Sequence, residues 1–101
     1  MRITETSAYK SADKIIGDAL RRRGSESDDY HVRPLQETGF GIPMYALRLC
    51  RRLHAIIGRE DVSLRDVVMA DTCASGHVDY HRKFALYCAE LAEYGKMVGR
   101  L

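Results

Sequence analysis

Residues whose side chains can do chemistry are concentrated between Asp71 and Leu91. Two cysteines, two histidines and two aspartates occur in this segment. These residue types bind metal ions, transfer protons and attack electrophiles. They also occur where the polar start of a helix leads into an apolar core. The segment therefore has two functional interpretations, a metal site and a catalytic site, besides a structural one.

Helix geometry limits which of these residues can share a metal ion. His81 and Cys88 are seven residues apart, so on a helix they lie about 10.5 Å apart along the axis. One zinc ion, with bonds of about 2.0–2.3 Å, cannot hold both. His77 and His81 are one helical turn apart and can share an ion. Cys73 precedes them closely enough to join them.

A second metal arrangement draws on another predicted helix. Cys50 and His54 have the same i, i+4 spacing as His77 and His81. Pairs of ligands one turn apart on facing helices build metal sites in helical bundles. If the two helices pack antiparallel in the right register, the sequence predicts a zinc site as one alternative function, formed by Cys50, His54, His77 and His81. No other cofactor is expected.

The same segment contains the parts of a nucleophilic site. Cys73 with His77 or His81 resembles a thiol beside a base, and Asp71 or Asp79 could orient the imidazole. However, the sequence contains no glycine-rich phosphate loop and no cofactor fingerprint. A helical chain of 101 residues also leaves little room for a pocket of ~300 Å³. We therefore do not expect an enzyme.

An arginine-rich helix face suggests a nucleic-acid-binding regulator as the first alternative function. Its residues are Arg48, Arg51, Arg52 and Arg59, and no acidic residue occurs among them before Glu60. Arginine pairs well with phosphate. Residues 21–23, all arginine, would extend this face if the helices are neighbours.

Two sequence features argue against strong or specific nucleic-acid binding. The net charge of +2 is small for a protein that coats nucleic acid. The helix carrying these arginines, Gly58 and a helix from Ser63 loosely suggest a helix-turn-helix. The connection between them is longer than the usual 3–4 residues, and the second helix is short and apolar.

A stripe of tyrosines marks the last predicted helix as the preferred interaction surface. Tyr80, Tyr87 and Tyr94 recur at seven-residue intervals, and Leu86 falls on the polar side of the same helix. Tyrosine is enriched in the energetically important residues of protein interfaces. We therefore expect a small non-enzymatic regulatory or adaptor protein. It would bind a partner protein, or a second copy of itself as a homodimer, through the last helix.

The elements that position these residues follow from apolar residues spaced three and four apart. This spacing predicts an all-α fold over a single domain, residues 1–101. Three main helices run over about residues 7–23, 43–57 and 76–96, and a short helix begins at Ser63 with a capping box to Asp66. Residues 24–41 are predicted to be a long irregular segment, with the presence of a strand left open. The inward face of the last helix comprises His77, His81, Phe84, Cys88, Leu91 and Ala92.

The composition indicates a soluble globular protein. Hydrophobic residues make up 46% of the chain and charged residues 30%. Three cysteines exclude a complete disulfide framework. The first residues lack the apolar run of a signal peptide, and no stretch approaches the ~20 apolar residues of a membrane span. We therefore expect a cytoplasmic protein with free thiols and no membrane partner.

Overall fold

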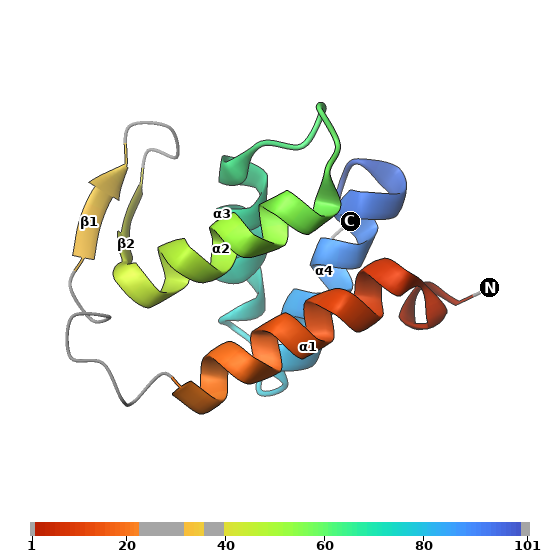
Figure 1. Ribbon diagram of the computed structural model, residues 1–101, viewed down its shortest axis with the longest axis horizontal. Helices are drawn as coiled ribbons and strands as arrows, with labels where there is room; N and C mark the ends of the chain where they lie inside the picture. Colours follow the sequence, from red (N-terminus) through yellow and green to blue (C-terminus); the bar gives the residue numbers. More distant parts are fainter. Residues whose placement is uncertain (1, 23–31, 36–39, 100–101) are drawn as a thin grey trace.

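The fold is mainly helical, as the sequence predicts. The structure, a computed structural model, describes residues 2–22, 32–35 and 40–99. These residues form four α-helices, a single 3₁₀ turn and one β-hairpin (Figure 1). In chain order the elements are η1 (Ile3–Glu5), α1 (Ser7–Arg22), β1 (Val32–Leu35), β2 (Phe40–Pro43), α2 (Met44–Ile57), α3 (Leu64–Ala74) and α4 (Tyr80–Tyr94).

Local signals in the sequence account for several helix ends. Helix α2 begins directly after Pro43 and ends at Gly58, whose φ of 63° lies in the left-handed region that glycine tolerates. The predicted capping box precedes α3. The Asp66 N–H donates to Ser63 Oγ at 3.2 Å, and the Ser63 N–H donates to Asp66 Oδ2 at 2.8 Å. These interactions are local, so they can be found from the sequence alone.

The boundary between α3 and α4 differs from the prediction. Helix α3 continues to Ala74, and both the N–H and the hydroxyl of Ser75 then donate to the Asp71 carbonyl, at 2.9 and 2.8 Å. Helix α4 begins at Tyr80 rather than near Gly76. The chain needs the intervening polar residues to reverse direction between two packed helices. The predicted short helix is thus 11 residues long, and His77 lies in a loop.

The question left open for residues 24–41, whether they contain a strand, is answered by a β-hairpin. Strands β1 and β2 pair antiparallel, from Val32 opposite Pro43 to Leu35 opposite Phe40. Strands of four residues are too short to be recognised by periodicity. Each strand contains a proline. Proline is tolerated in edge strands, and both strands of a two-stranded sheet are edge strands. Residues 24–31 and 36–39 of the predicted segment lie outside the described residues.

The helices form two layers, with α1 and α2 side by side in front of α3 and α4 in Figure 1. Helix α4 packs against both α1 and α3. Because neighbours cover several of its sides, seven of its 15 residues are buried. The buried residues of α4 are Phe84, Ala85, Tyr87, Cys88, Ala89, Glu90 and Leu91. This helix therefore belongs mainly to the interior, which limits the surface it can offer to a partner.

The packing of α1 against α4 depends on a glycine. Gly17 of α1 is buried, and a Cβ atom at this position would lie 3.1 Å from Cε1 of His81 on α4. The His81 ring is held in place from α1, because its Nε2 lies 2.9 Å from the Asp13 carbonyl oxygen. The absence of a side chain at Gly17 thus makes room for an imidazole ring between the two helices.

Candidate functional site

Helix α2 carries a group of three exposed arginines, and we take this group as the candidate site. Arg48, Arg51 and Arg52 are all exposed. They face outward because Leu49 and Leu53, on the opposite side of the same helix, are buried in the core. Helix α2 contains no aspartate and no glutamate. We call Arg48, Arg51 and Arg52 the arginine surface.

Two members of the arginine surface have no intramolecular partner within the described part of the chain. These are Arg51 and Arg52, for which no hydrogen bond or ion pair occurs among those residues. Their guanidinium groups therefore keep their hydrogen-bond donors available for a bound anion.

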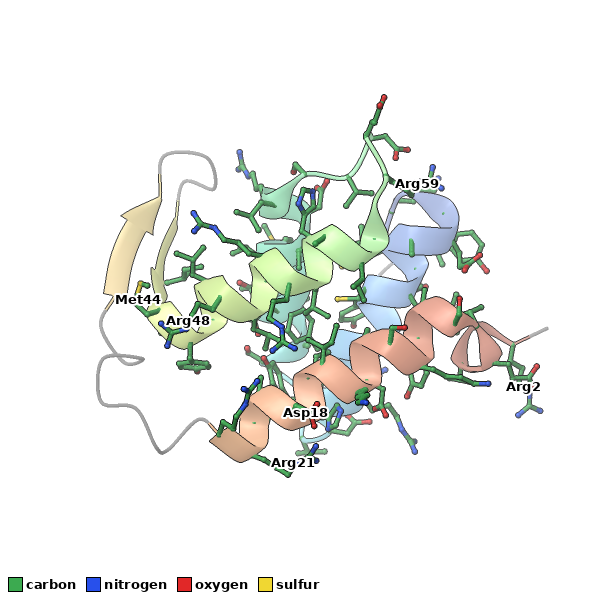
Figure 2. The ribbon with its side chains drawn as sticks, viewed as in Figure 1. Arg2, Asp18, Arg21, Met44, Arg48 and Arg59 are labelled. Atoms are coloured by element: carbon green, nitrogen blue, oxygen red, sulfur yellow. The ribbon has the colours of Figure 1, made fainter. Side chains whose placement is uncertain are left out.

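The structure separates Arg59 from the other predicted arginines. Figure 2 shows Arg48 near the start of α2 and Arg59 beyond its end, beside α4. Arg59 donates from Nε and Nη2 to the two carboxylate oxygens of Asp61, both at 2.8 Å, and from Nη1 to the Ala92 carbonyl at 3.4 Å. The hydrogen bonds from Arg59 lower the pKa of Asp61 below its usual range. Arg59 therefore ties the connection between α2 and α3 to the end of α4.

The predicted extension of the arginine surface onto α1 is not formed by Arg21. This residue pairs with Asp18 on its own helix, and Figure 2 shows it on the side of α1 away from α2. Arg22 donates from Nε to the Asp18 carbonyl at 3.4 Å. Arg23 lies outside the described residues. We therefore restrict the arginine surface to the three residues of α2.

The predicted tyrosine stripe is not a continuous surface. Tyr87 is only 4% exposed and belongs to the core, whereas Tyr94 is 53% exposed. Tyr80 is half-buried, and its hydroxyl donates to Asp71 Oδ1 at 2.6 Å. Leu86 is also half-buried. Seven-residue spacing identifies one face of a helix, but it does not reveal that neighbouring helices cover that face.

The four predicted zinc ligands are not brought together. Cys50 is buried between helices, and His54 Nε2 lies 2.8 Å from the Val62 carbonyl oxygen. His77 is exposed in the loop before α4. His81 faces α1 rather than α2, with Nε2 3.0 Å from Asp13 Oδ1. In the described ranges, no three histidine, cysteine or acidic side chains are grouped as a metal site requires.

Two of the cysteines are in surroundings that suppress thiol reactivity. Burial raises the pKa of the Cys50 thiol far above its ordinary value, and the nearby Asp71 carboxylate raises it further. The pKa of Cys88 is also raised, first by burial and then by Cys50 and Asp71. The thiolate is the nucleophile, so both thiols are inert near neutral pH. Asp71, whose carboxylate contributes to both shifts, accepts a hydrogen bond from the Tyr80 hydroxyl.

Helix α4 carries a buried glutamate side chain that the sequence did not predict. Glu90 is 4% exposed, and its Oε2 accepts the Gly99 N–H at 2.8 Å. Its Oε1 has no hydrogen-bond partner among the described residues. Glu90 lies on the polar side of the predicted helix, so the sequence contains no signal for its burial. The contact fastens the segment after α4 back onto that helix.

Similarity to other proteins does not supply a function. Comparison of the chain with protein-family models, with curated proteins and with solved structures finds no match. Within the described residues, no helix has the length and apolar character needed to cross a membrane. The functional inference therefore depends on the exposed chemistry described above.

Proposed function

We propose that the protein is a non-enzymatic binding protein that contacts nucleic acid through the arginine surface. The observation that carries the proposal is the outward clustering of Arg48, Arg51 and Arg52 on a helix without carboxylates. Phosphates are the dense negative charges of nucleic acids, and the planar guanidinium matches two phosphate oxygens at once. The absence of carboxylates from α2 leaves this attraction unopposed on the helix itself.

The state of the buried chemical groups supports a binding role over a catalytic one. Burial raises the pKa of Cys50, Cys88 and Tyr80, so all three keep their protons near neutral pH. Asp71, one of the two carboxylates that the sequence offered to orient an imidazole, accepts a hydrogen bond from Tyr80. These groups therefore stabilise the junction of α2, α3 and α4.

Removing two members of the arginine surface tests the proposal. The double variant Arg48→Ala/Arg52→Ala should bind a DNA duplex roughly thirtyfold more weakly at moderate salt, because each phosphate contact contributes about 1 kcal/mol. The plot of log K against log salt should also become shallower by about 2, since two counterion-releasing contacts are lost. Fluorescence anisotropy over a salt series measures both quantities.

A control variant separates local contacts from net charge. Arg2, which precedes η1, and Arg82, on α4, are both exposed. The variant Arg2→Ala/Arg82→Ala removes the same charge as the first double variant and leaves α2 unchanged. This control should retain nearly all of the affinity. Equal weakening by the two double variants would show that overall charge, rather than the arginine surface, drives binding. Absence of duplex binding by the native protein at low salt would refute the proposal.

Self-association through the end of α4 is a second candidate function, favoured by one observation. Tyr94 is 53% exposed and Val98, just beyond the helix, is 37% exposed, so two apolar side chains remain on the surface there. This is the part of the predicted tyrosine stripe that stays accessible. If it forms a homodimer seam, sedimentation velocity should show a dimer that Tyr94→Ala converts to monomer. A monomeric native protein at high concentration would exclude this candidate.

A further inference from the structure

We infer that the arginine surface binds the phosphate backbone of duplex nucleic acid and does not read base sequence. The inference rests on the proposed function and specifies its ligand. Three structural features carry it: the side chains available on α2, the position of α2 beside α1, and the placement of the described aromatic rings. Each limits the contacts that the surface can make.

The side chains of α2 are suited to phosphates rather than to base edges. Bases are distinguished in the major groove largely by asparagine, glutamine, acidic and hydroxyl side chains, together with bidentate arginine or lysine at guanine. Helix α2 contains no asparagine, glutamine, aspartate, glutamate, serine or threonine, and its one hydroxyl is on Tyr45, which is half-buried. Besides its arginines, its exposed residues include Ala55 and Ile56, which are apolar. Only arginine can therefore donate to a nucleic acid from this face.

The neighbouring helix limits how far these arginines reach toward base edges. A helix with its side chains is about 10–12 Å across, and the major groove is about 12 Å wide, so a groove admits one helix. Helices α1 and α2 lie side by side in the same layer (Figure 1) and pack against each other. The flank of α1 therefore limits how deeply α2 can enter a groove. We expect the arginine surface to contact the phosphate ridges that border it.

Helix α3 is poorly suited to serve as a recognition helix in place of α2. It follows α2 in the chain, as the recognition helix does in a helix-turn-helix. However, it packs against both α2 and α4, and Val67, Val68, Ala70 and Ala74 are buried. Of its residues, only Arg65 and Thr72 are exposed, so it offers few side chains that could contact bases. This limits the second source of base contacts.

The placement of the aromatic rings favours a duplex over a single strand. Proteins bind single strands by stacking bases on exposed aromatic rings beside a basic groove. Tyr45, the only aromatic residue of α2, is half-buried, and it lies near enough to Tyr80 to contribute to raising the pKa of that residue. Of the rings whose exposure the structure describes, only Tyr94 is classed as exposed, and it is on α4. No such ring is thus exposed beside the arginines.

Binding to three probes tests the inference. The probes are two DNA duplexes of equal length and unrelated sequence, and one single strand of that length. The two duplexes should have dissociation constants within about twofold of each other, and the single strand should bind at least about fivefold more weakly. The slope of log K against log salt should be no steeper than about −2.7, which corresponds to three phosphate contacts on a duplex. Fluorescence anisotropy provides all of these values.

Single-residue variants sharpen the same experiment. Arg51→Ala should make the salt slope shallower by about 0.9 for both duplexes alike, and Arg82→Ala should leave it unchanged. A tenfold preference for one duplex, or tighter binding of the single strand, would overturn the inference while leaving nucleic-acid binding in place. No binding to any of the three probes at low salt would overturn both the inference and the proposed function, and would point to an acidic protein partner.

Discussion

Raising the pH from about 8 to about 10.5 should lower the free energy of unfolding by about 5 kcal/mol through Cys50 and Cys88 alone. Burial raises the pKa of both thiols in the folded protein. In the unfolded chain they titrate near the ordinary value of about 8.5. Above that pH the unfolded chain releases two protons that the folded protein retains, so stability falls as the pH rises.

The size of this effect follows from proton linkage. Each thiol that ionises only on unfolding lowers stability by about 1.36 kcal/mol per pH unit above its unfolded pKa. The contribution is negligible below about pH 8 and grows steadily above it. Tyr80 acts in the same direction at higher pH, because burial and Asp71 also raise its pKa. Since small domains are stable by only about 5–15 kcal/mol, the loss at pH 10.5 should be a large share of the total stability.

Urea unfolding followed by circular dichroism, under reducing conditions and at several pH values, measures this dependence. The variant Cys50→Ala/Cys88→Ala should be less stable at neutral pH because it leaves small cavities. Its stability should nevertheless fall much less steeply between about pH 8.5 and 10.5. Each single variant should remove about half of the slope. A double variant with the native slope would show that the thiols are not its cause.

Tyr87→Ala should destabilise the fold by about 3–5 kcal/mol, the usual cost of removing a large buried ring. The reason is the burial of Tyr87 in the core, where it is only 4% exposed. This expectation differs from the sequence prediction, which places Tyr87 in a tyrosine stripe on the interaction surface of the last helix. The measurement is the midpoint of urea or thermal unfolding.

Tyr94→Ala provides the matched control, because Tyr94 is on the same helix but 53% exposed. Its effect on the free energy of unfolding should stay within about 1 kcal/mol. If Tyr87→Ala were as stable as Tyr94→Ala, the assignment of Tyr87 to the core would be wrong. The two variants therefore distinguish a structural tyrosine from a surface tyrosine at sites one heptad apart.

The sequence predicts best those elements whose signals are local. Helix α1 begins at Ser7 as expected, α2 ends at Ile57 before its glycine, and Ser63 caps α3 through Asp66. Each of these depends on residues within one or two turns of each other. The outward position of Arg48, Arg51 and Arg52 follows from the same periodicity, because their apolar neighbours must face the core.

Three of the differences from the sequence prediction concern contacts between distant parts of the chain. Nothing near His81 in the sequence indicates that it meets Asp13 on α1 instead of facing Cys50 and His54. Nothing near Tyr87 indicates that α4 is covered on several sides. The separation of Arg59 from the arginine surface depends on the Ala92 carbonyl, which only the fold brings close. Periodicity identifies faces, but topology decides what each face meets.

The close approach of α1 and α4 has a consequence for how this sequence can vary. A Cβ atom at Gly17 would lie 3.1 Å from the ring of His81, so the two positions share one volume. An alanine at position 17 requires the ring at position 81 to shift by a few tenths of an ångström, and a larger residue there is accommodated more easily when position 81 has no ring. In a set of related sequences, substitutions at these two positions should therefore occur together, and their covariation would record the packing of the two helices.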